Sequence, residues 1–274
     1  MRNHAEATDP DPSPSASPRG PVAYATRFQD AGSVRAYEEA EYGSESYSSL
    51  IWRLQQPFLR ALLTAELGEV PRPPRLLDFA CGTGRILSFV ETLVAECEGV
   101  DISPAMVEVA RRKCTRARLL VGDPLARPEL LTPPYDIITS FRFLLNVEPR
   151  LRHDALGLLH RSIRQPGGLL LINMHGNSRS SRHPAVAWKR WRQRRGRVAD
   201  PNQMLNEMSP EETRLLLQTA GFQIVRQLGF GLVPPTLYRT PLRPIALALD
   251  RCSAGRSWAA HRAIDLLFVC RPAN

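Results

Sequence analysis

Residues 78–84 read DFACGTG, and this stretch decides the fold of the 274-residue chain. It ends an apolar run, residues 75–79, that lies between a proline-rich turn and two glycines, which is the pattern of a short buried strand. Gly82 and Gly84 then precede a segment that we expect to be helical. A ligand placed here meets glycine backbone without side-chain clashes, together with the free amides that begin the next helix. We therefore expect a ligand at the carboxyl end of this strand, as in other open parallel sheets.

Outward from this stretch, the chain alternates between predicted strands and helices. The other strands are expected at residues 97–102, 118–121, 135–140, 169–174, 222–228 and 265–271. Helices are expected at residues 33–66, 86–96, 103–113, 153–164 and 209–221, with Pro57 as a break or a new start within the first. The first five strands are continuous apolar runs, which favours a parallel sheet covered on both faces. The pattern predicts an α/β, Rossmann-like, doubly wound fold with a mostly parallel seven-stranded sheet and helices on both faces.

The remaining segments indicate a tail, one domain and two insertions. Residues 1–21 are rich in Pro, Ser and Asp and bury too little apolar surface to offset their ordering entropy, so we expect a disordered tail. Residues 22–274 are expected to form a single domain, whose first part, residues 22–70, supplies helices that cap the binding site. The segments 178–204 and 231–262 are expected to be insertions that build a cap over the substrate.

Composition argues against several classes of protein. The chain has no uncharged apolar run of about 18 residues, and its first residues lack the pattern of a secretory signal. The five cysteines form no CxxC pair and have no histidine at metal-ligand spacing, which is typical of reduced thiols in a cytosolic protein. We therefore expect a cytoplasmic protein without a metal cofactor.

The net charge of +9 comes almost entirely from one segment. Residues 179–197 hold seven arginines and one lysine without an acid, and outside them 28 basic residues face 27 acidic ones. Such a segment can bind an anionic acceptor, lie on anionic lipid with Trp188 and Trp191 on one helical face, or contact RNA. It can also be a solvated lid helix whose tryptophans pack on the core. We rank an anionic small molecule or a lipid-linked glycan above RNA, because no RNA-binding module accompanies the segment, and we expect no DNA partner.

Two further acids end the second and third predicted strands. Asp101 lies nineteen residues after Gly82, and a carboxylate there can accept hydrogen bonds from both hydroxyls of a ribose. Asp123 ends the third strand, where it can accept the amino group of an adenine. A nicotinamide dinucleotide site is the rival interpretation, but it requires glycine at the position of Leu87. Asp78 would also repel a pyrophosphate, so the acids favour a different adenosine-containing cofactor.

Together these motifs resemble the class I S-adenosylmethionine-dependent methyltransferases. The family's glycine motif matches residues 77–85, its ribose and adenine acids match Asp101 and Asp123, its fourth-strand motif matches residues 136–140, and its pre-strand turn matches residues 164–168. The resemblance covers residues 35–174 well and 205–274 loosely. It implies S-adenosylmethionine as methyl donor. The residues that it places around this cofactor are Tyr37, Asp78, Ala80, Gly82, Gly84, Arg85, Asp101, Ile102, Met106, Asp123, Pro124, Ser140 and Phe141. Ala80 is a mild departure, because many members have glycine there.

The loops that follow the fourth and fifth strands are the expected acceptor side. We expect Arg142 and Asn146 from one loop, and Asn173 and Asn177 from the other, to contact the substrate. His175 ends the fifth strand and has a suitable pKa to remove the proton of a hydroxyl, with a structural histidine bonded to backbone as the alternative. The loops are similar to those of a bacterial subgroup associated with polysaccharide or secondary-metabolite pathways. We therefore predict methyl transfer to a small molecule or sugar, at a hydroxyl.

Two alternatives remain open. One is an RNA or protein methyltransferase that uses the Arg-rich segment 179–197. The other is a protein that binds S-adenosylmethionine without catalysis. The tetrapeptide TPPY, residues 132–135, resembles a loop of enzymes that methylate amino groups of nucleic acid bases, but it precedes the fourth strand, so we interpret it as a turn.

Overall fold

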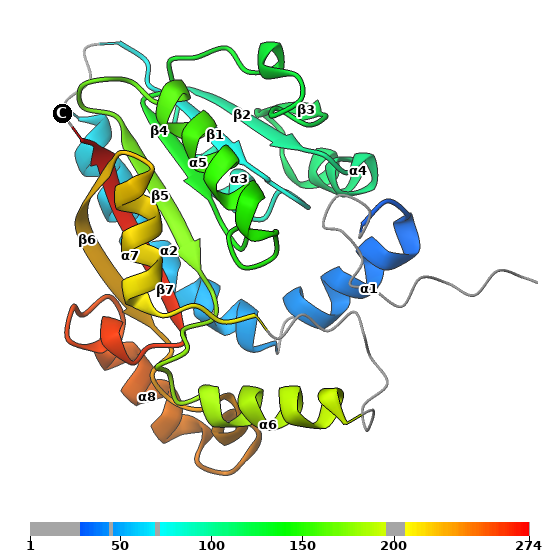
Figure 1. Ribbon diagram of the computed structural model, residues 1–274, viewed down its shortest axis with the longest axis vertical. Helices are drawn as coiled ribbons and strands as arrows, with labels where there is room; N and C mark the ends of the chain where they lie inside the picture. The colour runs from blue at the N-terminus through cyan, green and yellow to red at the C-terminus, as the bar shows by residue number, and fades with distance from the viewer. Residues whose placement is uncertain (1–27, 44–45, 69–71, 196–205, 274) are drawn as a thin grey trace, which may run out of the picture.

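A seven-stranded sheet forms the centre of the molecule, in the order β3-β2-β1-β4-β5-β7-β6 (Figure 1). Strand β7 runs opposite to the other six strands, which confirms the predicted Rossmann-like, mostly parallel sheet. The strands are β1 (Arg75–Phe79), β2 (Glu96–Asp101), β3 (Arg118–Val121), β4 (Ile137–Ser140), β5 (Leu169–Met174), β6 (Phe222–Phe230) and β7 (Asp265–Pro272). This computed structural model describes residues 28–43, 46–68, 72–195 and 206–273, so the predicted tail of residues 1–21 lies outside the described residues.

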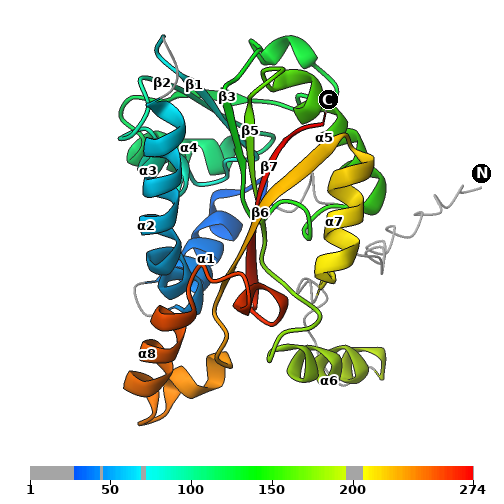
Figure 2. The same ribbon diagram turned by 90° about the vertical axis from the view of Figure 1, so that its left-hand side faces the viewer.

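Helices cover both faces of the sheet, as expected. Successive side chains of a strand point to opposite faces, so Leu76 packs in one buried cluster and Leu77 in the other. The Leu77 cluster includes apolar residues of α5 and α7, and the Leu76 cluster includes those of α2 and α3 (Figure 2). The helices are α1 (Ala31–Tyr42), α2 (Tyr47–Leu67), α3 (Leu87–Val90), α4 (Pro104–Lys113), α5 (Pro149–Ser162), α6 (His183–Arg194), α7 (Pro210–Thr219) and α8 (Arg243–Ser253), with short 3-10 helices η2 (Pro128–Leu130), η3 (Pro235–Arg239) and η4 (Ala259–His261).

Two expected helices differ from the prediction. The segment 33–66 contributes to two helices, and the second begins after Ser46, whose hydroxyl accepts the amide of Ser49, so that Pro57 lies inside α2 and is not a break. The helix expected at residues 86–96 is a single turn, because β2 begins at Glu96 in register with Arg75. Turns flank this single helical turn on both sides before β2 begins.

The carboxyl ends of the parallel strands meet α1, α6 and the segment 231–262, which contains η3, α8 and η4 (Figure 1). Because β7 is antiparallel, its first residue, Asp265, lies at this same end, paired with Phe230. Residues from the two predicted insertions thus come together with the strand ends that carry the predicted site. Within the described part of the chain, no helix is long and apolar enough to cross a membrane.

Candidate active site

One cavity of about 920 Å³ lies at the carboxyl ends of the strands. Its size is in the range of binding sites for small molecules and cofactors. It is lined by the glycine loop after β1, by α1 and the start of α2, by the loops after β2, β4 and β5, and by residues of α6, η3 and the start of β7. The cavity therefore spans both the expected cofactor side and the expected acceptor side.

The cavity collects most of the residues that the sequence assigns to the site. Those that line it are Tyr37, Asp78, Ala80, Gly82, Arg85, Asp101, Ile102, Met106, Phe141, Arg142, Asn146, Asn173 and His175. Those outside its lining are Gly84, Asp123, Pro124, Ser140 and Asn177. The cofactor motifs and the acceptor loops thus converge on one space.

The two glycines of the loop have different surroundings. Both have a positive φ, 54° for Gly82 and 73° for Gly84, which favours glycine. A Cβ at Gly82 would meet no atom within 4 Å, so this backbone is open to the cavity. A Cβ at Gly84 would lie 2.9 Å from Ala110 Cβ and from Cys114 Sγ. Gly82 therefore permits close approach of a ligand, whereas Gly84 permits close packing of the loop on α4.

Asp78 presents an unpaired carboxylate oxygen at the glycine loop. Its side chain is buried, Oδ1 accepts the Thr139 hydroxyl at 2.6 Å, and Oδ2 has no hydrogen-bond partner among the described residues. Burial raises the pKa of Asp78 to about 7, because an unpaired charge is costly to desolvate. A cationic group in the cavity would satisfy Oδ2 and stabilise the charged form.

Asp101 is fixed by the backbone of two neighbouring loops. Oδ2 accepts the amide of Gly82 and Oδ1 accepts the amide of Ser103, each at 2.9 Å. Burial raises the pKa of this carboxyl, while the two amide bonds oppose that rise. Each oxygen has a second lone pair, so the oriented carboxylate can also accept two ligand hydroxyls. Asp78 and Asp101 together suit a ligand that carries an ammonium group and a ribose.

Two predicted site residues hold the structure around the cavity together. Asp123 accepts the amide of Leu125 at 2.9 Å and so stabilises the turn after β3. The amide of Asn177 donates to the carbonyls of His261 and Ala263, which ties the loop after β5 to the second insertion. These bonds account for the position of both side chains without a ligand.

Arg142 attaches α1 to the loop after β4. Its guanidinium contacts the Glu41 carboxylate at 2.8 Å and donates to the Ser48 hydroxyl at 2.9 Å. The Asn146 amide donates to the Arg142 carbonyl, and the guanidinium also faces the Tyr42 ring. Arg142 thus forms an ion pair with Glu41 of α1. No pattern in the sequence indicates this pairing.

The acceptor half of the cavity contains a histidine that is neutral at physiological pH. Burial, together with the guanidinium groups of Arg142 and Arg182, holds the pKa of His175 well below its usual 6.5. Its Nδ1 is buried and has no hydrogen-bond partner among the described residues, and neither has the buried hydroxyl of Tyr47. These unpaired polar atoms line the same cavity, so they are available to a polar ligand.

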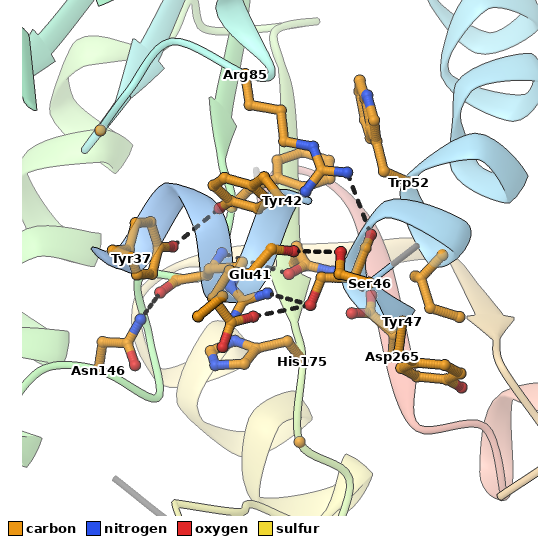
Figure 3. Close-up of a pocket in the computed structure, with 18 of the residues that line it drawn as sticks. Tyr37, Glu41, Tyr42, Ser46, Tyr47, Trp52, Arg85, Asn146, His175 and Asp265 are labelled. Carbon is orange, nitrogen blue, oxygen red and sulfur yellow. Dashed lines mark hydrogen bonds and ion pairs between the residues drawn. The ribbon is translucent and has the colours of Figure 1, made fainter. Parts of the chain in front are cut away.

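Asp265 is the site residue that sequence reasoning missed (Figure 3). Its Oδ1 accepts the side-chain amide of Gln55 at 2.6 Å and that of Asn173, and its side chain lines the cavity. Burial raises the pKa of Asp265 to about 7, although both amides and Arg142 oppose that rise. An acid at the start of the last strand is a visible signal, but it indicates the site only when that strand is known to run antiparallel.

Comparison with known proteins gives the family. Residues 51–227 match a family model described as a methyltransferase domain. The chain is 37% identical over 119 residues to dTDP-4-amino-2,3,4,6-tetradeoxy-D-glucose N,N-dimethyltransferase of Saccharopolyspora spinosa, an alignment that covers 39% of this chain and 46% of that protein. It is 35% identical over 109 residues to demethylmenaquinone methyltransferase of Thermus thermophilus, which covers 36% and 46% respectively. The chain thus spans about half the length of these curated relatives.

A solved structure shows the same fold. Magnesium protoporphyrin IX methyltransferase from Synechocystis PCC 6803, with bound S-adenosylhomocysteine, superposes with a TM-score of 0.54 at 14% identity, over 89% of this chain and all of that one. The family model matches more than half of the chain. The observed sheet, the glycine loop and the acids Asp78 and Asp101 agree with it. The chain therefore belongs to the class I S-adenosylmethionine-dependent methyltransferases.

Proposed function

We propose that this chain transfers a methyl group from S-adenosylmethionine to a hydroxyl of a small molecule, a sugar among the candidates. The observation that carries the proposal is one cavity with buried, unpaired polar atoms on both sides, Asp78 Oδ2 on the cofactor side and His175 Nδ1 and the Tyr47 hydroxyl on the acceptor side. The two curated relatives act, by their names, on a sugar and on a quinone precursor, which supports a small-molecule acceptor.

The cofactor side is suited to S-adenosylmethionine in its charge and shape. Asp78 Oδ2 would bind the ammonium group, Asp101 would accept the ribose hydroxyls, and the open backbone at Gly82 would admit the ligand closely. When bound, the cofactor supplies a methyl group that is already activated by a positive sulfur. The chain therefore contributes mainly by positioning the reactants and excluding water. Helix α1 would help to cover the cofactor, because Glu38 of that helix accepts a hydrogen bond from Thr83 of the glycine loop.

Two groups on the acceptor side can take the proton of a hydroxyl as its oxygen bonds to the methyl carbon. His175 is neutral and can accept a proton, but its low pKa makes it a weak base. Asp265 has a pKa of about 7, which is well matched to proton transfer at physiological pH. We assign the proton to Asp265 and a hydrogen-bonding role to His175. An amine acceptor is the second candidate, because a buried carboxylate also suits an ammonium group.

Activity is tested by incubating the purified protein with labelled S-adenosylmethionine and fractionated small molecules, including nucleotide sugars. We expect S-adenosylhomocysteine and a labelled small product in an equal ratio, because each transfer yields one of each. Mass spectrometry of the product identifies whether oxygen or nitrogen carries the methyl group. If label enters only RNA or protein, or if cofactor binds without turnover in every fraction, the proposed acceptor class is wrong.

Cofactor affinity should depend on pH through Asp78. Below about pH 7 this carboxyl is protonated in the free protein and must lose its proton to pair with the ammonium group. We expect the affinity for S-adenosylmethionine to fall by about tenfold for each pH unit below that point and to level off above it. Calorimetric titrations across this range measure the slope. Asp78→Asn should bind weakly and without this slope, and an unchanged slope in the variant would assign the titration to another group.

A further inference from the structure

Two cations at α6 line the cavity. Arg182, at the start of α6, and Lys189 line the cavity together with Val186, and their spacing of four and three residues places all three on one face of the helix. Arg239, at the end of η3, adds a third cation to the lining from the other insertion. Arg182 and Lys189 are exposed, but both belong to the lining of the site, so part of the Arg-rich segment faces the cavity.

These three cations form no ion pair with the described residues, although the charge of Arg182 favours the ionised forms of Glu41 and Asp265. No hydrogen bond or ion pair joins the side chain of Arg182, Lys189 or Arg239 to another described residue. Two carboxylates that line the same region already contact other cations, although Glu207 Oε1 has no hydrogen-bond partner among the described residues. Glu207, whose side chain is 3% exposed, contacts His183 at 2.9 Å and Arg190 at 3.5 Å, and Glu41 contacts Arg142 at 2.8 Å. This part of the cavity lining thus carries three cations that no ion pair with a described residue occupies.

Arg182 lies near the two groups, His175 and Asp265, that are assigned to the reacting atom of the acceptor. Its guanidinium helps to lower the pKa of His175 and opposes the rise in the pKa of Asp265, so it lies near both groups. A ligand that contacts Asp265 therefore lies within the influence of the Arg182 charge. Phosphate groups offer several charged oxygens to cations from more than one direction, which suits three donors on two elements better than a single carboxylate does.

We propose that the acceptor carries a phosphate or diphosphate ester and that Arg182, Lys189 and Arg239 bind it while the methylated atom lies at Asp265. This inference rests on the proposed function and narrows its substrate class. The same chemistry occurs in nucleotide-linked and in lipid-linked sugars. Trp188 and Trp191 lie on the outer face of α6, 58% and 39% exposed and stacked with ring centroids 5.0 Å apart, so a membrane source of the ester is one arm of the test.

The test uses protein saturated with S-adenosylhomocysteine. Calorimetry measures binding of thymidine diphosphate and of inorganic pyrophosphate, and flotation measures binding to phosphatidylcholine vesicles with and without a polyprenyl diphosphate. For a nucleotide-linked acceptor we expect thymidine diphosphate to bind, with affinity reduced by about tenfold in Arg182→Gln, Lys189→Gln or Arg239→Gln. For a lipid-linked acceptor, binding to the diphosphate vesicles should show the same losses. Arg192→Gln and Arg194→Gln are matched controls on α6 outside the cavity lining and should retain binding.

The outcomes separate this inference from the proposed function. If neither diphosphate probe binds, or if the control variants lose as much affinity as the cavity variants, the ester site is wrong. Binding of a single-stranded RNA through Arg192 and Arg194, without diphosphate binding, would overturn it as well. Titration of S-adenosylhomocysteine into each variant verifies the fold, and failure of that titration in the unmodified protein would instead count against the proposed function.

Discussion

Asp101→Ala is expected to weaken S-adenosylmethionine binding by at least about a hundredfold. The carboxylate is buried, and its two oxygens are fixed by the amides of Gly82 and Ser103, so it is already oriented to accept both ribose hydroxyls. Each hydrogen bond to a charged group contributes about 1.5–3 kcal/mol, and loss of two therefore costs about 3–6 kcal/mol of binding free energy. Isothermal titration calorimetry with the cofactor or its demethylated product measures the change.

A structural effect of this substitution must be separated from a binding effect, because Asp101 also holds the glycine loop. Thermal unfolding without ligand reports the structural part, and Glu108→Ala on the exposed face of α4 is the matched control that should keep full affinity. A variant that unfolds normally but fails to bind supports the assignment. Unchanged affinity in Asp101→Ala would contradict the ribose assignment and with it the reading of the whole cofactor side.

The cofactor side was predictable because its signals are local. A strand end, two glycines and an acid lie within a few residues of one another, and the order of the first strands follows from the alternation of elements. The structure adds that Gly82 faces the cavity and Gly84 faces α4, a distinction that depends on where Ala110 lies. The apolar pattern of the flanking strand and helix does not differ between Gly82 and Gly84. The sequence therefore does not show which glycine faces the ligand and which packs on α4.

The acceptor side was less predictable because it depends on contacts between distant segments. Arg142 remains a predicted substrate contact, and the structure adds an ion pair with Glu41 of α1 that no local pattern indicates. The sequence shows segment 179–197 as basic throughout. The structure shows that Lys189 lines the cavity and that Arg192 does not, because they lie on different faces of α6. These contacts follow from how α1 and the two insertions fold over the strand ends, which no local pattern specifies.

Asp265→Asn is expected to lower kcat by about a hundredfold to ten-thousandfold while cofactor affinity stays the same. The substitution is nearly isosteric, and the remaining carbonyl oxygen can still accept the amides of Gln55 and Asn173 that now bind Oδ1. It therefore removes the proton-accepting oxygen without removing the hydrogen bonds that hold the side chain. His175→Ala is the comparison, and we expect a smaller loss because the low pKa of that ring makes it a poor base.

The pH profile distinguishes a base from a merely structural carboxylate. With Asp265 as the base, kcat/KM for the acceptor should rise with pH and level off above about pH 7, because the free enzyme must hold this carboxyl deprotonated. Asp265→Asn should remove that limb, whereas a structural role would lower the rate equally at every pH. A larger loss in His175→Ala than in Asp265→Asn would return the base to the histidine. If both variants keep their rates, the chain supplies no base, and the activated methyl group reacts through positioning by the cavity alone.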